Sequence, residues 1–314
     1  MQSILEKHSS VLTEKNNLSG KILFTFIEWL FRISLFLTIA VLALITVYIF
    51  WNGFKLFHEV SIAEFFLSTK WIPPKKIFGI LPMIISSFYI TIASTLISAP
   101  IGIACAVWSS EIAGSSLRKL IQTSVQILAG IPSVVYGLVG FVVITPWIRT
   151  LGQVTGYSLL AAIIILSIMI LPTIVSISQD AIQSVPKELK QASLALGATE
   201  MQTITKVILP VAKPGIITAV VLAISRAFGE AMAVKMVIGS IETMPKFDAE
   251  SWFGLLSPGR TLTTNIIIDL NYAYGTHLDA LFATGAVLFI VIMIVNYFAY
   301  ILRNHSSKLK KSKK

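Results

Sequence analysis

Long stretches without a single charged residue constrain this chain more than any other feature of its sequence. A helix that crosses a bilayer needs about 20 consecutive, mainly apolar residues. Five charge-free stretches are 19 to 34 residues long: Ile33–Trp51, Ile77–Ser110, Leu120–Ile148, Thr150–Gln179 and Ala280–Leu302. Charged residues make up only 13% of the 314 residues, whereas a soluble domain usually has about a quarter. The sequence therefore predicts an all-α, multi-pass integral membrane protein and excludes an ordinary soluble enzyme.

Six membrane-spanning helices are predicted, and they cover residues 26–53, 80–108, 121–148, 158–178, 214–240 and 280–303. The first follows mostly polar sequence and is predicted to be an uncleaved anchor. The fifth is unusual because it carries Arg226, Glu230 and Lys235. Pro132 and Pro172 lie inside the third and fourth helices. A proline there removes a hydrogen bond, so it either kinks a helix that must bend or is a static kink packed by its neighbours.

The distribution of basic residues orients these helices. An even number of spans puts both ends of the chain on one side. With both termini in the cytoplasm, the inner segments hold 15 Lys and Arg residues, the outer loops 7 and the spans 3. Cytoplasmic segments are enriched in these residues, so cytoplasmic termini are expected. The net charge of +10 comes from the basic residues concentrated in these inner segments, so it does not indicate that the chain binds nucleic acid. The tail Lys308–Lys314 either contacts anionic membrane lipid or is solvated.

Residues for catalysis or metal binding are not grouped in this sequence. The histidines His8, His58, His277 and His305 lack the spacing of metal ligands. Cys105 is the single cysteine, so an intrachain disulfide is excluded. The predicted spans contain no Ser/His/Asp arrangement for nucleophilic catalysis. We therefore expect no catalytic residues, no metal site and no enzymatic activity of this chain.

Two long loops are expected to be ordered and functional. The outer loop 241–279 holds five acidic residues against two basic ones, and its stretch Thr261–Tyr274 predicts a helix that could re-enter the membrane. The cytoplasmic loop predicts a helix–glycine–helix hairpin over residues 186–210. Its first helix follows Pro186 and stops at Gly197, and its second covers residues 199–209 and ends at Pro210. An amphipathic hairpin of this kind suits docking into a groove on a partner.

The spacing of this hairpin resembles the EAA loop of bacterial ABC-importer permeases, which has a Glu-Ala-Ala triplet, a glycine and an Ile-x-Leu-Pro tail. The matching positions are Gln191, Ala192, Ser193, Gly197, Val207, Leu209 and Pro210. In that family the loop inserts into the ATP-hydrolysing subunit and transmits its movement to the membrane helices. Gln191 replaces the family's glutamate, so a salt bridge from that position is not expected. The chain has no G-x-x-x-x-G-K-[ST] phosphate loop. The resemblance therefore implies that Mg-ATP binds to a separate ATPase and that this chain holds no cofactor.

Two further stretches resemble permeases of the phosphate-specific (Pst) importer. Residues 129–138 (AGIPSVVYGL) match a motif of the third span that contains Gly130, Pro132, Ser133, Tyr136 and Gly137. Its glycines, together with Gly140, permit close helix approach. Residues 226–234 (RAFGEAMAV) resemble the C-type subunit, with Ala231 in place of the usual threonine. The resemblance implies a type I (MetI-like) permease core over residues 80–303. A cytoplasmic segment 1–25 and a first helix with its outer loop 26–79 precede this core, and a basic cytoplasmic tail 304–314 follows it.

The same resemblance implies a place in the bacterial inner membrane and a complex with four partners. These are a homologous A-type permease, two ATP-binding cassette ATPase subunits and an extracytoplasmic phosphate-binding protein. The expected function is a permease subunit of an ATP-driven phosphate importer, coupled to the ATPases through the EAA loop. One alternative is a permease for another oxyanion, such as sulfate or molybdate. The other is a secondary transporter that uses Arg226 and Glu230 as an ion relay.

Arg226 is the residue we expect to lie in the substrate pathway. It is predicted about 18 Å into the fifth span, near its middle. A charge there costs about 2.5–3.5 kcal/mol unless it faces the bundle interior, a partner or water. Glu230 is four residues on and within pairing reach, whereas Lys235 falls on roughly the opposite face without an assigned role. Two interpretations stay open. Either the guanidinium binds phosphate oxygens with the help of Glu230, or the two residues form a structural ion pair.

Overall fold

The structure is a computed structural model that describes residues 2–151 and 155–311, with side chains for residues 24–151 and 155–301. The chain divides into two units, residues 1–52 and 53–314. The first unit holds most of one long helix, α1 (Gln2–Lys55), and the second contains all the other elements.

The described part of the second unit is mainly helical. The long helices are α3 (Leu81–Val107), α4 (Ser115–Gly130), α7 (Leu159–Gln183), α10 (Leu209–Gly229) and α13 (Thr276–Lys311). The short ones are α2 (Ile62–Leu67), α5 (Ser133–Val139), α6 (Thr145–Arg149), α8 (Lys187–Ala195), α9 (Glu200–Thr203), α11 (Met232–Val237) and α12 (Leu262–Asp269). Two 3₁₀ turns are η1 (Leu56–His58) and η2 (Pro73–Lys75), and three π-helical turns are η3 (Trp108–Ile112), η4 (Gly140–Ile144) and η5 (Ile204–Ile208). Strands β1 (Trp71–Ile72) and β2 (Ile77–Phe78) form one antiparallel hairpin.

Within the described residues, five continuous helical segments are long and apolar enough to cross a membrane. They are Phe24–His58, Leu81–Ile112, Leu159–Gln183, Glu200–Gly229 and Thr276–Ile301. A sixth crossing is possible if α4 and the helical segment Ser133–Arg149 count as one broken span. The prediction of an all-α membrane protein with multiple spans is confirmed, but several predicted helix ends are wrong.

The first and last helices extend past their predicted bounds. Helix α1 begins at Gln2 rather than residue 26, because residues 2–25 contain no proline and a single glycine to interrupt it. Helix α13 continues through residue 303 to Lys311. The side chains of residues 1–23 and 302–314 lie outside the described residues, and so does the predicted lipid contact of the basic tail.

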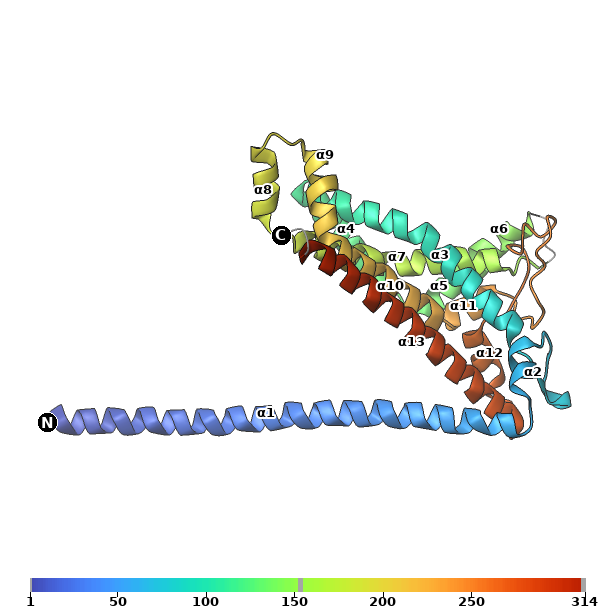
Figure 1. Cartoon of the computed structure of the whole chain (residues 1–314), viewed down its shortest axis with the longest axis horizontal. Helices are drawn as coiled ribbons and strands as arrows, with labels where there is room; N and C mark the ends of the chain where they lie inside the picture. The colour runs from blue at the N-terminus through green and yellow to red at the C-terminus, as the bar shows by residue number, and fades with distance from the viewer. Residues whose placement is uncertain (1, 152–154, 312–314) are drawn as a thin grey trace. The chain divides into compact units, whose positions relative to one another are not determined.

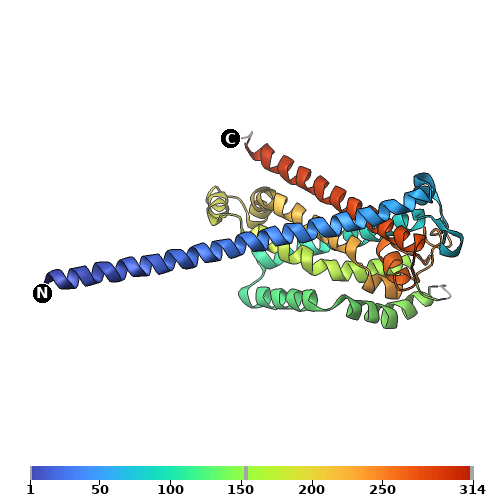
Figure 2. The same cartoon turned by 90° about the horizontal axis from the view of Figure 1, so that it is seen from below.

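The third predicted span, 121–148, is not one helix. Helix α4 ends at Gly130, α5 begins at Ser133, and the two segments are bent by 93°. The residue before a proline is driven to extended backbone, and Ile131 accordingly has φ −70° and ψ 127°. Tyr136 fixes the bend by donating a hydrogen bond from its hydroxyl to the Leu128 carbonyl at 2.7 Å. Figure 2 shows α4 and α5, in green shades, along one edge of the bundle.

Helix α7 is the centre of the second unit. It packs against α3 on one side and α10 on another, and α10 packs against α13 (Figures 1 and 2). Small residues bring α3 and α7 together, as expected for membrane helices. The Ser98 hydroxyl donates to the Ser167 carbonyl at 2.8 Å, and Gly102 leaves no room for a Cβ against Ile174. Pro172 is buried inside α7 without interrupting it, which agrees with the static interpretation.

The fifth predicted span, 214–240, begins and ends further along the chain than the helical segment in the structure. The helical segment runs from Glu200 through Pro210 to Gly229 without a break, and α11 is a separate helix. The predicted stop at Pro210 is wrong because the π turn η5 precedes that residue. In η5 the Leu209 N–H bonds the Ile204 carbonyl, five residues back. This wider turn accommodates a residue that has no N–H to donate.

The outer loops place short elements at the end of the bundle opposite α8 and α9 (Figure 1). Residues 56–78 of the first outer loop form η1, α2 and the β1–β2 hairpin, with η2 between the strands. The helix predicted over Thr261–Tyr274 is confirmed only as α12, which ends at Asp269. A capping box starts it: the Thr261 N–H donates to the Thr264 hydroxyl at 2.8 Å, and the Thr264 N–H donates back at 3.1 Å.

Candidate functional site

Arg226 lies inside the helix bundle, half-buried near the end of α10. Its Nη1 donates a hydrogen bond to the Thr173 hydroxyl at 2.9 Å. Thr173 is the fifteenth of the 25 residues of α7, so the guanidinium lies level with the middle of that helix. A charged side chain that faces lipid is costly, so Arg226 is predicted to face the bundle interior, a partner or water. Its position inside the bundle agrees with that prediction.

Glu230 does not pair with Arg226 among the described residues, so the structural ion pair between them, one of the two open interpretations, is not formed. Helix α10 ends at Gly229, so Glu230 has extended backbone instead of lying one helical turn above the arginine. Its Oε1 accepts the Ala233 N–H at 3.0 Å, at the start of α11. A carboxylate is favourable at that end of a helix because the first N–H groups lack partners there.

The motif of the third span is brought against α11. A Cβ on Gly137 would lie 2.9 Å from the Ala233 Cα, and a Cβ on Gly140 would lie 2.8 Å from a Val237 methyl. These two glycines permit close approach as predicted, whereas Gly130 has open space around it. Pro132 precedes α5 and Ser133 is its first residue. The motif therefore sets the bend between α4 and α5 and the packing of α5 on α11.

The hairpin over residues 186–210 has the predicted shape in its first half. Helix α8 follows Pro186 and ends before Gly197, which has φ +85°. The Gly197 N–H donates to the Leu194 carbonyl at 2.9 Å, and the Ala198 N–H donates to the Ser193 carbonyl at 3.2 Å. These two bonds form a Schellman motif, which requires a left-handed residue at the position of the glycine.

Polar contacts hold the hairpin to the end of the bundle. The hydroxyl groups of Ser193 and Thr203 lie 2.9 Å apart and join α8 to α9. Lys190 Nζ pairs with Glu111 of η3 at 2.7 Å. Arg118 donates to the carbonyls of Ser109 and Ser110 in the same turn, at 2.8 and 2.5 Å. The hairpin is thus tied to η3, which Arg118 in turn joins to α4, and it continues into α10.

The remaining positions of the predicted coupling loop are partly exposed on the surface of the hairpin and partly packed against its neighbours. Gln191, Ala192 and Pro210 are exposed, while Val207 and Leu209 are half-buried. At the tip, Leu196 and Met201 are 89% and 61% exposed. Large apolar side chains at that exposure indicate a surface that a partner covers.

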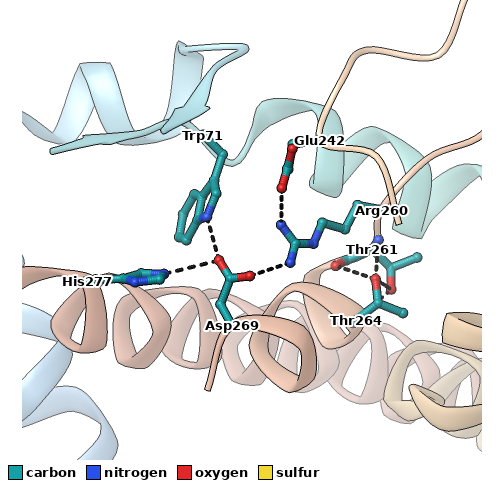
Figure 3. Close-up of polar contacts among 7 residues, drawn as sticks. All are labelled: Trp71, Glu242, Arg260, Thr261, Thr264, Asp269 and His277. Carbon is teal, nitrogen blue, oxygen red and sulfur yellow. Dashed lines mark hydrogen bonds and ion pairs between the residues drawn. The ribbon is translucent and has the colours of Figure 1, made fainter. Parts of the chain in front are cut away.

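A second polar cluster lies at the end of the bundle opposite α8 and α9, and Figure 3 shows it. Arg260 is 2% exposed and donates to Glu242 at 2.7 Å and to Asp269 at 2.5 Å. The other Asp269 oxygen accepts the Trp71 indole N–H at 2.8 Å and lies 3.1 Å from His277 Nε2. The cluster joins β1, the loop before α12, the end of α12 and the first turn of α13, and thereby fixes the outer loops to the bundle.

We expect Asp269→Asn to lower the stability of the protein. Burial raises the pKa of Asp269, but the Trp71 hydrogen bond and the Arg260 charge outweigh it and hold that pKa below its usual value. Its stabilisation is therefore present above the unfolded pKa of about 3.9 and lost as the pH falls through the lower folded value. Breaking this pair should cost about 3 kcal/mol at pH 7, the lower end for buried pairs, because Glu242 still pairs with Arg260.

Thermal unfolding of the detergent-solubilised protein checks this. Glu242→Gln is the matched control, because the Glu242 side chain is 44% exposed and an exposed pair contributes about 1 kcal/mol or less. The difference between wild type and Asp269→Asn should shrink below pH 4. Equal effects of the two substitutions, or a difference that does not change with pH, would contradict this assignment.

Sequence reasoning missed most partners of the site. Thr173, Glu111 and the Arg260 cluster come from segments far apart along the chain, so no local spacing identifies them. The excess of acidic residues in the outer loop was the one available signal for a buried arginine there. Among the described residues, no group of three or more His, Cys, Asp or Glu side chains could hold a metal ion.

Comparisons with known proteins agree with the sequence resemblance. A model of the family "binding-protein-dependent transport system inner membrane component" matches residues 98–310. A probable ABC transporter permease protein, YqgH of Bacillus subtilis, is 45% identical over 274 residues, which cover 83% of this chain and 86% of that protein. The phosphate transport system permease protein PstC of Mesorhizobium japonicum is 32% identical over 253 residues, which cover 74% and 75%.

Solved structures share the fold. A bacterial alginate ABC transporter, solved with an alginate-bound periplasmic protein, matches with a TM-score of 0.58 and 20% identity, over 87% of this chain and 93% of that chain. The inward-facing methionine ABC transporter MetNI matches with a TM-score of 0.56 and 22% identity, over 76% and 99%. The family match, the relatives and the shared architecture together establish that the chain belongs to the binding-protein-dependent inner membrane components, the transmembrane permeases of ABC transporters.

Proposed function

We propose that this chain is a permease subunit of an ATP-driven importer of inorganic phosphate. The proposal rests on the hydrogen-bond donors of Arg226 that have no partner among the described residues. In the described part of the chain its guanidinium has one hydrogen-bond partner, Thr173, so most of its five donors are left for a ligand. The planar fork of an arginine matches the oxygens of a phosphate. Several relatives are named phosphate transport system permease protein PstC, which supports the same substrate.

Glu230 supports a preference for phosphate over sulfate. One of its carboxylate oxygens is used by the Ala233 N–H, and the second is available at the point where α10 ends. That oxygen accepts the hydrogen of a protonated phosphate, which a sulfate dianion does not have. In this proposal Arg226 binds the anion, and Glu230 favours an anion that carries a hydrogen over one that does not.

The hairpin over residues 186–210 would couple the pathway to ATP hydrolysis. Its tip exposes Leu196 and Met201, its turn is fixed by Gly197, and its second helix continues into α10, which carries Arg226. A push on the hairpin therefore reaches the arginine through one continuous helix. Mg-ATP binds to two partner ATPase subunits, and this chain holds no cofactor.

The complete transporter would contain this chain, a homologous A-type permease, the two ATPases and an extracytoplasmic phosphate-binding protein. It would stand in the bacterial inner membrane with the termini of this chain in the cytoplasm. Closure of the ATPase dimer moves the hairpins, the pathway opens outward, and the binding protein delivers the anion. The fold match to an alginate transporter described with a periplasmic protein supports this arrangement.

Reconstitution of the complex in liposomes tests the proposal. We expect phosphate uptake that requires ATP and the binding protein, with ATP hydrolysis rising when phosphate is supplied and not when sulfate is supplied. Accumulation of phosphate without nucleotide would favour the secondary transporter and overturn the proposal. A preference for sulfate or molybdate would retain the ATP-driven permease and overturn phosphate as its substrate.

A further inference from the structure

Lys235 lines a cavity, and the sequence assigns no role to this residue. The cavity has a volume of about 600 Å³ and lies beside α11. Its walls include Val134 and Phe141 of the third span, Tyr157, and Met232 and Met236 of α11. Among the described residues that line the cavity, Lys235 is the one with a charge. In the described part of the chain the Lys235 side chain is exposed and makes no hydrogen bond or ion pair.

The prediction that Lys235 lies on roughly the opposite face from Arg226 assumed one helix from residue 214 to residue 240, and the structure divides that stretch between α10 and α11. Gly229 ends α10, and α11 begins at Met232 as a separate helix. Both cations border α5 as a result. Val134 of α5 lines the cavity of Lys235, and Tyr136 of α5 lies near enough to Arg226 for an electrostatic interaction.

The two cations stand at different levels of the bundle. The Ser158 N–H donates to the Val237 carbonyl at 3.1 Å, so the end of α11 lies level with the start of α7. Arg226 bonds Thr173, fifteen residues further along. At about 1.5 Å per residue these levels are about 22 Å apart. Lys235 is therefore near the outer end, and Arg226 is near the middle.

The surroundings of Lys235 are unfavourable for an ammonium group that faces lipid. Val134, Phe141 and Met232 are each more than 40% exposed around it. A lysine that faces lipid is unfavourable unless its ammonium group reaches water, and none of the described residues that line the cavity is a carboxylate that would neutralise it. An unneutralised cation between low-dielectric walls concentrates anions at its position when water fills the space.

We propose that Lys235 is a second anion-binding station, which receives an inorganic oxyanion at the outer end of the pathway and passes it to Arg226. This inference rests on the proposed function of the chain. An ammonium group is a compact, strongly hydrated charge, whereas a guanidinium offers a fixed fork. Lys235 therefore captures the anion loosely and raises the rate of entry, and Arg226 holds it in one orientation.

Charge rescue in the assembled transporter tests the inference. The single native thiol is first removed with Cys105→Ala, and Lys235→Cys is added to that parent. We expect Lys235→Cys to lower uptake at low phosphate concentration about ten-fold, the lower end of electrostatic focusing effects. Aminoethyl methanethiosulfonate, which adds a lysine-like ammonium, should restore uptake. The anionic sulfonatoethyl reagent should not, and added phosphate should slow both modifications.

The outcomes separate this inference from the function on which it rests. Lys75→Cys, at an exposed lysine of the outer loop, is the control and should transport normally before and after modification. Full uptake by Lys235→Cys, failure of the reagents to reach it, or modification by the cationic reagent without rescue would each overturn the anion station. If Arg226→Gln still abolishes uptake in that case, the proposed function stands. A parent complex that takes up no phosphate overturns both.

Discussion

Arg226→Gln is expected to abolish ATP-driven phosphate uptake while the complex still assembles and hydrolyses ATP. Glutamine keeps much of the side-chain length but removes the charge and the fork. Two hydrogen bonds from a charged donor contribute about 1.5–3 kcal/mol each, so their loss lowers uptake about 100-fold or more. Uptake into liposomes and ATP hydrolysis by the same preparation measure the two activities separately. Normal uptake by this variant would remove Arg226 from the pathway.

Thr173→Val distinguishes the substrate role of Arg226 from a structural one. It removes the hydroxyl that accepts the Arg226 hydrogen bond and leaves the guanidinium in place. If Arg226 only locks α10 to α7, Thr173→Val reproduces the loss of uptake seen with Arg226→Gln. If Arg226 binds the anion, Thr173→Val reduces stability by about 1 kcal/mol and retains most of the uptake.

Gly197→Val is expected to uncouple ATP hydrolysis from transport or to prevent the ATPase from binding. Gly197 has φ +85° and nothing within 4 Å of the position of a Cβ. The effect of a side chain there is therefore confined to the backbone. A β-branched residue held in the left-handed region costs about 1–3 kcal/mol. That is enough to lower the population of the native turn by about five-fold to more than 100-fold, with a matching loss of coupled uptake.

Gly197→Asn is the matched control, because asparagine tolerates left-handed backbone better than valine does. We expect it to retain most of the coupling, with Gly197→Ala between the two. Co-purification with the ATPase and the ratio of phosphate transported to ATP hydrolysed are the measurements. Equal loss in the asparagine and valine variants would show that the size of the side chain, rather than the backbone angle, matters at this position. Unchanged coupling in Gly197→Val would remove the hairpin from the coupling pathway.

The hairpin illustrates how far local sequence signals reach. Pro186 and Gly197 set the start and end of α8, because both act on the backbone within a few residues. The stop predicted at Pro210 failed for a reason that no single residue reveals. The π turn at residues 204–208 absorbs the proline, and its buried Ile204 and Ile208 pack with Ile182 and Ala212 in one apolar cluster. Tertiary packing of that cluster keeps the helix continuous.

In the candidate site, too, the sequence predicts some features and only the packing of the helices decides others. The apolar run that contains Arg226 identified a charge inside the bundle, because the penalty for a charge in hydrocarbon is large and independent of its neighbours. The pairing with Glu230 that the sequence allowed is not formed, since a four-residue spacing brings two residues together only while the helix continues. Gly229 ends it, and the arginine bonds Thr173, 53 residues away along the chain.

The sequence by itself determined that this chain is a helical membrane protein, where most of its spans lie, and that one hairpin carries the marks of a docking loop. These properties follow from hydropathy and backbone preference, which are summed over neighbouring residues. Only the tertiary structure decided that the third span bends by 93°, that Arg226 bonds α7, and that Lys235 opens onto a cavity beside α5. The physical reason is that these features depend on contacts between helices distant in sequence. Breaks at Pro132 and Gly229 redirect the chain, and packing then selects which side chains meet.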